Sequence, residues 1–385
     1  MARSESLRLA GLGHSEIRAM TQACARVQGI NLAQGVCDTG VPELVAKAVQ
    51  PAVDQGFNIY TRFDGLPQIR QAIARKTAAY NGMQVDPESQ IVVSAGATGA
   101  FHAACLALLN PGDEIILFEP YYGYHVHAIA SVDARVVTVP LSVPDWGLDL
   151  TALERAITPR TKAILVNTPG NPSGKVFTTQ ELDAIGALAT AHDLWVITDE
   201  IYEYFLYDVR PHVSLAARPG MAERTITIGG YSKTFAITGW RIGHAVASPR
   251  WAQAIGAMND LLYVCAPAPL QHAVSVGIDR LPTSFYEGLR VQYQTKRDRF
   301  CRVLQEIGLT PIVPQGAYYV LADVRSVPGR TGKERALHLL EKTGVAGVPG
   351  EAFFSGTSGA DYLRFCYAKT DKDLDAACER LARLR

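Results

Sequence analysis

Short apolar runs alternate with helix-like patterns between about residue 90 and residue 230 of the chain. The runs are found at 90–96, 113–120, 134–141, 162–169, 194–201 and 224–230. Because they are β-branched and nearly continuous, they predict strands buried on both faces of a mostly parallel sheet. The segment "TTQELDAIGALATAHD" has a helical pattern, and Thr178 or Thr179 can cap its start. We therefore expect an α/β core.

The pattern changes after about residue 281. A long helical stretch over 282–308 is followed by apolar segments at 318–324, 344–350 and 362–368, with helical patterns between them and at the end. This order predicts a smaller α+β unit. We expect residues 1–45 to pack with it, which gives a large domain over 46–280 and a small domain formed by 1–45 and 281–385.

The composition is that of a well-packed globular protein and narrows the choice of partners. Of the 385 residues, 48% are hydrophobic, and 37 basic residues balance 37 acidic ones. This balance gives no electrostatic reason to expect binding to nucleic acid or to a membrane. The 7 cysteines form no CxxC pair, and neither a signal peptide nor a membrane span is evident. We therefore expect a soluble cytoplasmic protein with small-molecule partners.

The stretch "GGYSKTFAITGWRIG" at 229–243 carries the strongest chemical signal. Lys233 follows an apolar strand, at the end where α/β sheets place their ligands. A lysine is costly to bury charged, so it is either exposed or used chemically. A desolvated lysine forms an imine with an aldehyde readily, and Arg241 is a cation suited to a phosphate. An aldehyde and a phosphate on one ligand indicate pyridoxal phosphate (PLP).

This cofactor needs a carboxylate facing its ring nitrogen, so that the ring can act as an electron sink. Asp199 ends the run at 194–201 and fits that need, although capping the following helix would explain it equally well. Tyr202 and Asn171 can donate hydrogen bonds to the oxygen on the ring. The loop "NPSG" that contains Asn171 is also typical of a simple turn.

The cofactor also needs backbone donors for its phosphate and an aromatic side chain over its ring. The helix after the run at 90–96 exposes N–H groups near Ala97 and Thr98, which can bind an anion with help from the helix dipole. The segment "FEPYYGYH" offers Tyr121, Tyr122 and Tyr124 for the ring, although aromatic residues after a strand are often there for packing.

Taken together, these residues make the sequence similar to the class I/II aminotransferases, which are PLP-dependent enzymes of fold type I. It most resembles the branch that contains kynurenine/glutamine and bacterial aspartate aminotransferases. The resemblance runs from "INLAQGV" near residue 30 to "LRFCYA" near residue 367, and residues 230–243 carry the family's lysine signature. It implies a large domain with a mostly parallel seven-stranded sheet and a smaller α+β domain.

The resemblance also implies a ping-pong transfer of an amino group from an L-amino acid to a 2-oxo acid. Its implied catalytic residues are Lys233, which forms the Schiff base and moves the proton, together with Asp199 and Tyr202. The implied cofactor-binding residues are Ala97, Thr98, Tyr122, Asn171, Asp199, Tyr202, Ser232, Lys233, Arg241 and, from the neighbouring subunit of a homodimer, Tyr60. The implied substrate-binding residues are Gly35, Asn171 and Arg364, with Arg364 holding the α-carboxylate.

The sequence departs from the family's usual pattern in three respects. Gly230 stands where many relatives have a serine, which puts one phosphate contact in doubt. Residues 37–40 replace a common motif of the substrate pocket and suggest an unusual side-chain specificity. A second arginine for dicarboxylate substrates is not evident, and Arg62, close to Tyr60, is a speculative candidate.

Several other functions remain open on the sequence. A biosynthetic lyase, cyclase or oxidase on the same scaffold would also use Lys233 and PLP, and only the substrate pocket would distinguish it. A nucleotide-binding loop in "GNPSGKV" fails the P-loop spacing. A metal site on His125 and His127, which would share one strand face, lacks a third ligand, so we expect no metal. A non-catalytic regulator would need a DNA-binding segment, for which the chain has no spare length.

Overall fold

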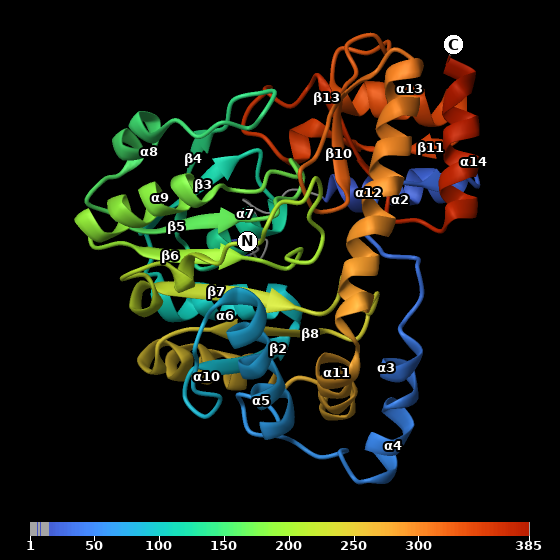
Figure 1. Ribbon diagram of the computed structural model, residues 1–385. Coiled ribbons are helices and arrows are strands. Elements are labelled where there is room, and N and C mark those ends of the chain that lie inside the picture. The colour runs from blue at the N-terminus through green and yellow to red at the C-terminus, as the bar shows by residue number, and fades with distance from the viewer. Residues whose placement is uncertain (1–5, 7, 9–14, 385) are drawn as a thin grey trace, which may run out of the picture.

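The computed structural model describes residues 6, 8 and 15–384, and its largest feature is a seven-stranded sheet (Figure 1). The strand order is β2-β8-β7-β6-β5-β3-β4. The strands are β2 (Ile91–Ala95), β3 (Glu114–Glu119), β4 (Arg135–Pro140), β5 (Thr161–Asn167), β6 (Trp195–Asp199), β7 (Thr225–Gly230) and β8 (Ile242–Val246). Only β8 runs antiparallel to its neighbours, β2 and β7. The predicted α/β fold with a mostly parallel sheet is confirmed.

Each predicted strand coincides with a strand of this sheet, but β8 was not among them. Its sequence, "IGHAV", is interrupted by Gly243 and His244, so it lacks the continuous β-branched character of the other strands. It pairs with both β2 and β7 and places residues 242–246 in the interior of the sheet.

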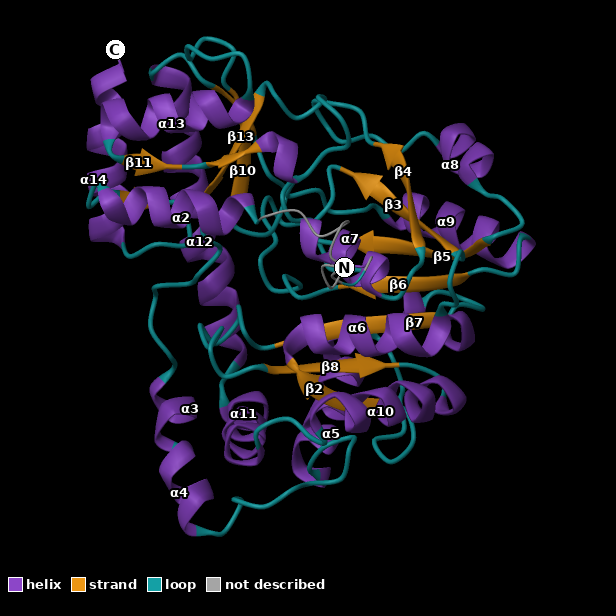
Figure 2. Cartoon of the chain, turned by 180° about the vertical axis from the view of Figure 1, so that it is seen from behind, coloured by secondary structure: helices purple, strands orange, loops and turns teal. Residues whose placement is uncertain are grey.

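Helices cover both faces of the large sheet, as its continuous apolar strands require. One face packs against α6 (Gly96–Leu108), α7 (Gly123–Ser131) and α10 (Pro249–Tyr263), which lie in front of the sheet in Figure 2. The other face packs against α8 (Leu150–Ala156) and α9 (Thr179–Ala191). Along β3, Ile115 and Leu117 face the first layer while Ile116 and Phe118 face the second.

Helix α9 begins where its sequence predicts. The Thr178 side chain accepts a hydrogen bond from the backbone N–H of Glu181, and the Glu181 carboxylate accepts one from the N–H of Thr178. This reciprocal pair is a capping box, which satisfies two of the donors at the start of a helix. Thr178, not Thr179, is therefore the cap.

The first part of the chain and the helices around β2 form the lower part of the molecule in Figure 1. Helices α3 (Glu43–Lys47) and α4 (Val49–Asp54) lie along α11 (Ala268–Arg280), which also packs on α5 (Pro67–Lys76). A single π-helical turn, Thr77–Asn81, follows α5. Val45 belongs to the core formed by these helices and β2.

The predicted α+β unit lies at the other end of the molecule, upper right in Figure 1. Its antiparallel sheet has the order β12-β13-β10-β9, and β1 pairs with β11 in a separate parallel pair. The strands are β1 (Ile30–Asn31), β9 (Thr310–Ile312), β10 (Tyr319–Asp323), β11 (Val345–Ala346), β12 (Val348–Pro349) and β13 (Tyr362–Cys366). The helices are α2 (Glu16–Arg26), α12 (Thr283–Glu306), α13 (Gly332–Thr343) and α14 (Asp371–Leu381).

The proposed domain limits stay a prediction. Residues 16–31 contribute α2 and β1 to the smaller unit, whereas α3 crosses the expected boundary at residue 45 and packs on α11. Residues 1–5, 7 and 9–14, also assigned to the small domain, lie outside the described residues. Among the helices of the described part, none combines the length and the apolar character that crossing a bilayer requires.

Candidate active site

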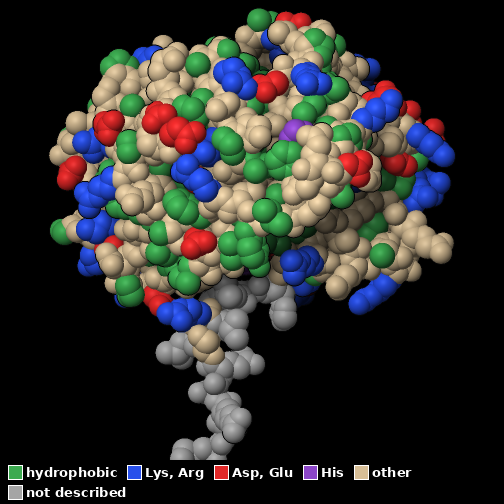
Figure 3. Space-filling view, turned by 90° about the horizontal axis from the view of Figure 1, so that it is seen from below, with side chains coloured by type: hydrophobic (Ala, Val, Ile, Leu, Met, Phe, Trp, Pro, Cys, Tyr) green, Lys and Arg blue, Asp and Glu red, His purple; other side chains and the backbone are tan. Residues whose placement is uncertain are grey.

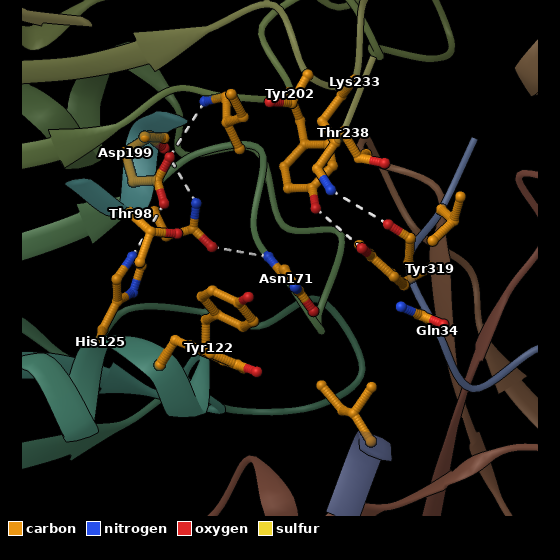
Figure 4. A pocket seen from close by; sticks show the side chains of 18 of the residues that line it. Gln34, Thr98, Tyr122, His125, Asn171, Asp199, Tyr202, Lys233, Thr238 and Tyr319 are labelled. Atoms are coloured by element: carbon orange, nitrogen blue, oxygen red, sulfur yellow. Dashed lines mark hydrogen bonds and ion pairs between the residues drawn. The ribbon is translucent and has the colours of Figure 1, made fainter. Parts of the chain in front are cut away.

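A cavity of about 520 Å³ lies at the carboxyl ends of the parallel strands, between the large sheet and the smaller unit (Figure 4). Nearly all the site residues predicted from the sequence line it. They are Gly35, Ala97, Thr98, Tyr122, Asn171, Asp199, Tyr202, Ser232, Lys233, Arg241 and Arg364. The exception is Tyr60, whose side chain is 79% exposed on the surface of the chain.

Lys233 enters the cavity from the loop after β7. Its Nζ donates a hydrogen bond to the backbone carbonyl of Gly35, at 3.1 Å. Burial lowers the pKa of the Lys233 amine, and the nearby cations Arg241 and Arg364 lower it further. The cavity thus favours a neutral amine, which can act as a nucleophile or as a base.

Asp199 lies at the end of β6 and is buried. Its Oδ2 is 2.9 Å from Nε2 of His125 on α7, and its Oδ1 accepts a hydrogen bond from the backbone N–H of Ile201, at 3.2 Å. The second bond resembles a helix-capping contact, which is the alternative role that the sequence suggested for Asp199. Figure 4 shows the carboxylate between His125 and the interior of the cavity.

His125 is a site residue for which the sequence analysis predicted no role. It was considered as a metal ligand sharing a strand face with His127, but both lie on α7, where positions two apart point in different directions. His125 is buried against Asp199, which it can orient. The aromatic run before it obscured the helix start.

The start of α6 gives the cavity a site suited to an anion. No side chain of the described residues caps this helix, so the first N–H groups remain available as donors. Ser232 and the exposed Arg241 lie beside it. A Cβ built on Gly96 would lie 2.4 Å from the Arg241 Nη2 atom, so glycine is what lets the guanidinium lie against this turn.

Arg364 on β13 is almost completely buried, and its guanidinium is held by neutral groups. Nη1 donates to the side-chain Oδ1 of Asn171 at 2.9 Å, and Nη2 donates to the carbonyl of Ala33 at 2.5 Å. Its Cζ lies 4.4 Å from the ring centroid of Tyr319. Within the described part of the chain it forms no salt bridge, so its charge is available to a carboxylate in the cavity.

Asn171 and Tyr202 both line the cavity and carry groups that can donate hydrogen bonds. Because Asn171 Oδ1 accepts from Arg364, its amide nitrogen is left to donate elsewhere. The Tyr202 hydroxyl lies 2.9 Å from that of Tyr319, a cavity residue that the sequence analysis did not identify. A Cβ at Gly35 would overlap the Tyr319 hydroxyl, so this close packing requires glycine there.

Two expectations about the substrate pocket stay predictions. From the N-terminal segment, the cavity is lined by Gln34, Gly35 and Val36, whereas residues 37–40 turn away from it. Cys37 is buried under the backbone of Lys233, and Asp38 forms an ion pair with Lys369. Arg62, the candidate next to the dimer-facing Tyr60, does not line the cavity of its own chain and pairs with Asp64 and Glu88.

An arginine that the sequence analysis missed does line the cavity. Arg18, on α2, is exposed at its edge and has no carboxylate within ion-pair distance among the residues described here. Gly230, the other departure, is packed tightly: an added Cβ would lie 3.0 Å from Ile201 and 3.1 Å from the backbone of Gly243. A serine there would need its neighbours to move.

The segment "GNPSGKV" has a structural role for its lysine. Lys175 is buried, and its Nζ lies 2.7 Å from Oε1 of Glu181 in the first turn of α9. The ion pair neutralises the lysine charge away from the main cavity. This structural role agrees with the sequence of the segment, whose spacing does not match that of a P-loop.

The cavity thus offers an anion site, a buried carboxylate and an amine of lowered pKa. This is the donor set that a phosphorylated pyridine aldehyde needs, so the residues present fit PLP. The fold and the cavity together define a PLP-dependent enzyme of fold type I.

Comparisons with known proteins narrow the classification of the chain further. The sequence pattern of the family "Aminotransferase class I and II" matches residues 27–381. A probable N-succinyldiaminopimelate aminotransferase of Mycobacterium tuberculosis is 39% identical over 94% of each chain. The three-dimensional structure of that bacterium's N-succinyldiaminopimelate aminotransferase superposes with a TM-score of 0.95 at 37% identity, covering 99% of this chain and 100% of the other.

Two further relatives belong to the branches that the sequence resembled. Kynurenine–oxoglutarate transaminase 1 of Mus musculus is 32% identical over 98% of this chain and 97% of its own. The structure of Thermus thermophilus aspartate aminotransferase with maleate has a TM-score of 0.93 at 32% identity and covers 100% of both chains. The chain belongs to the class I and II aminotransferases. It is a PLP-dependent aminotransferase, and its substrates are amino acids and 2-oxo acids.

Proposed function

We propose that Lys233 is the residue that moves the substrate proton in transfer of an amino group from an L-amino acid to a 2-oxo acid. The observation that carries this proposal is the position of its Nζ, in one cavity with the buried Asp199 and the unpaired charge of Arg364. Because burial and two cations lower the pKa of this amine, Lys233 can accept a proton from the substrate Cα.

Cofactor binding is assigned to two groups of cavity residues. The N–H groups near Ala97 and Thr98, with Ser232 and Arg241, would hold the phosphate. Asp199, oriented by His125, would hold the proton on the ring nitrogen. When bound, PLP supplies an aldehyde that condenses with the amino group and a ring that withdraws electrons from Cα.

The remaining cofactor contacts are assigned to aromatic and amide groups. Tyr122 would cover one face of the ring, and Tyr202 and Asn171 would donate to its oxygen. The bond between Asn171 Oδ1 and Arg364 supports the last assignment, because it leaves the amide nitrogen to donate into the cavity.

Substrate binding is assigned to Arg364, which would take the α-carboxylate in a bidentate pair. The guanidinium is already oriented by Asn171 and Ala33, so little side-chain freedom is lost on binding. Gly35 contributes its backbone, whose carbonyl also positions the Lys233 amine. Together these groups would direct the Cα–H bond toward Nζ of Lys233.

Arg18 is assigned to substrates whose side chain ends in a carboxylate. It is the additional unpaired arginine at the cavity edge within the described residues. Aspartate and N-succinyldiaminopimelate, from which relatives take their names, both carry a further carboxylate. Arg62, next to Tyr60, stays a second candidate for this role.

The functional unit is proposed to be a cytoplasmic homodimer. Ile59, Tyr60, Leu261, Leu262 and Val264 form an exposed apolar patch, whose two segments are joined where the Thr61 N–H donates to Cys265 Sγ at 3.4 Å. Figure 3 shows exposed hydrophobic side chains between charged ones on the underside of the molecule. Such patches mark contact surfaces, and Tyr60 would reach the phosphate site of the partner. The free state of all seven cysteines agrees with a reducing compartment.

The test is a product assay on the purified enzyme with PLP and a panel of amino acids, with and without 2-oxoglutarate or pyruvate. Keto acids should form catalytically only when an acceptor is present, and Lys233→Ala should lower turnover at least about a thousandfold. Arg18→Met should raise the KM for 2-oxoglutarate about tenfold and leave that for pyruvate unchanged. Multiple turnovers without an acceptor would instead establish elimination, cyclisation or oxidation.

A further inference from the structure

A second cavity, of about 610 Å³, lies outside the active site among the end of α5, the end of α11 and the start of α12. The chain from Asp199 to Tyr204 separates the two cavities. Asp199 and Tyr202 line the active site, whereas Tyr204 lines the second cavity. The volume is in the range of small-molecule sites.

One wall of this cavity is a stack of aromatic rings. The ring centroid of Tyr204 lies 4.5 Å from that of Tyr80 and 4.5 Å from that of Tyr286, with interplanar angles of 31° and 33°. Tyr80 is also parallel to His212, with centroids 6.0 Å apart. Rings so arranged offer faces and edges against which a planar aromatic ligand can pack.

Cationic side chains complete the cavity. Arg210 and Arg290 line it, and neither has a carboxylate within ion-pair distance in the part of the chain described. The Nε of Arg210 is buried without a hydrogen-bond acceptor there. Glu287 is the opposing charge at the edge, so two unpaired guanidinium groups face one exposed carboxylate. An arginine in this situation is suited to a bidentate contact with an anion.

The floor of the cavity is connected to the active site through a buried polar network. Lys76, which lines the cavity, forms an ion pair with Glu203, and Asn81 bonds to Glu203 at 2.9 Å. Glu200 accepts from Ser214 at 2.5 Å and lies 2.7 Å from Nε2 of His212, another lining residue. Glu200 and Glu203 flank Tyr202, so a change in their partners acts on the segment that carries the catalytic groups.

We propose that this second cavity binds an aromatic carboxylate, which acts as an effector of the enzyme. The ring would pack on Tyr204 and Tyr286, and the carboxylate would bind Arg290 and Arg210. A carboxylate here also attracts Lys76 and so competes with Glu203 for it. Binding would thereby shift the Glu203 network on the back of the Asp199–Tyr202 segment.

The test measures binding of 4-hydroxybenzoate to the holoenzyme by titration calorimetry, after aminooxyacetate has blocked the active site. This probe has neither an amino nor a keto group, so it is not a substrate. We expect one site per chain, and a Kd that rises about tenfold in Arg290→Met. Arg302→Met removes an equal charge from the same helix outside the cavity and should leave the Kd unchanged. Cyclohexanecarboxylate and 4-hydroxybenzamide should bind at least about tenfold more weakly than the probe.

The effector role is tested on the unblocked enzyme at saturating substrate. Saturating 4-hydroxybenzoate should change kcat at least about twofold in the wild type and not in Arg290→Met. Absence of binding in the blocked enzyme, or binding that Arg290→Met does not weaken, would overturn the site. Binding with an unchanged kcat would overturn the effector role.

Discussion

At the scale of single residues, the effect of the cavity on the pKa of the Lys233 amine can be tested without the cofactor. Burial first, then Arg241 and Arg364, lower its pKa from the ordinary lysine value of 10.5. Only the neutral amine reacts with trinitrobenzenesulfonate, so Lys233 should be labelled at lower pH than a surface lysine. Arg364→Met removes one of the cations, so the pKa should rise and the labelling midpoint should move to higher pH. Mass spectrometry of the labelled peptide gives the midpoint.

Arg18→Met is the matched control for this measurement. It also removes an arginine from the cavity lining, but Arg18 is not among the groups that lower the pKa of Lys233. Its labelling midpoint should stay at the wild-type value. A midpoint at the ordinary lysine pH in the wild type would contradict the role of Lys233 as a base near neutral pH.

Sequence alone could identify the site residues that stand next to strand ends. Lys233, Asp199 and the N–H groups near Ala97 were predictable because a buried run delivers each of them to one edge of the sheet. His125 and Tyr319 were not, because their importance lies in contacts with Asp199 and Tyr202, far away along the chain. Contacts between residues so far apart leave no recognisable pattern in the sequence around either residue.

At the scale of elements, β8 packs tightly against the start of α6. A Cβ on Gly243 would lie 2.4 Å from the backbone nitrogen of Ala97. Gly243→Ala should therefore push α6 away from the anion site and raise the Kd for PLP at least about tenfold, while lowering the free energy of unfolding by about 1–3 kcal/mol. Fluorescence titration with PLP and urea unfolding measure the two effects.

Gly288→Ala supplies the comparison. Gly288 lies within α12, and among the described residues nothing lies within 4 Å of the added Cβ. The substitution should leave PLP binding unchanged and stabilise the helix by about 0.5–1 kcal/mol. Equal PLP affinity in Gly243→Ala and Gly288→Ala would show that the β8–α6 contact does not hold the anion site.

Elements with a continuous pattern were predictable, and those with an interrupted pattern were not. The capping box of α9 and the long α12 follow from their sequences. Helix α7 begins directly after an aromatic run, so its two histidines were assigned the period of a strand. The five residues of β8 include a glycine and a histidine and become a strand because β2 and β7 lie on either side.

At the scale of the whole molecule, the proposed homodimer with shared active sites predicts complementation between two inactive variants. In a heterodimer of Lys233→Ala and Tyr60→Ala chains, one of the two sites has both its own Lys233 and an intact Tyr60 from the partner. Random assembly of equal amounts should restore about a quarter of wild-type activity. Activity assays on co-expressed chains measure it.

The apolar patch provides the control for this experiment. Leu261→Glu places a charge at an 80% exposed position in the patch and should dissociate the dimer, with loss of complementation. Leu337→Glu also introduces a charge, at a 44% exposed position on α13. It should leave the dimer and the complementation intact. Light scattering after gel filtration gives the mass. A monomeric wild-type enzyme with full activity would contradict the shared site.

The division into an α/β core and a smaller unit could be predicted because the strand and helix patterns change once along the chain. The course of residues 15–60 could not be predicted. They contribute α2 and β1 to the smaller unit, then cross to α11 and end at the exposed Tyr60. The position of each of these segments depends on surfaces that other parts of the chain form.

The exposure of the thiols gives the enzyme a built-in labelling site. Cys265 is partly exposed, whereas the other six cysteines are buried. A maleimide dye should therefore attach to the natural sequence mainly at this one position, beside Thr61 and the apolar patch. Energy transfer between donor- and acceptor-labelled chains would then follow subunit exchange of the proposed dimer in real time, with no engineered cysteine.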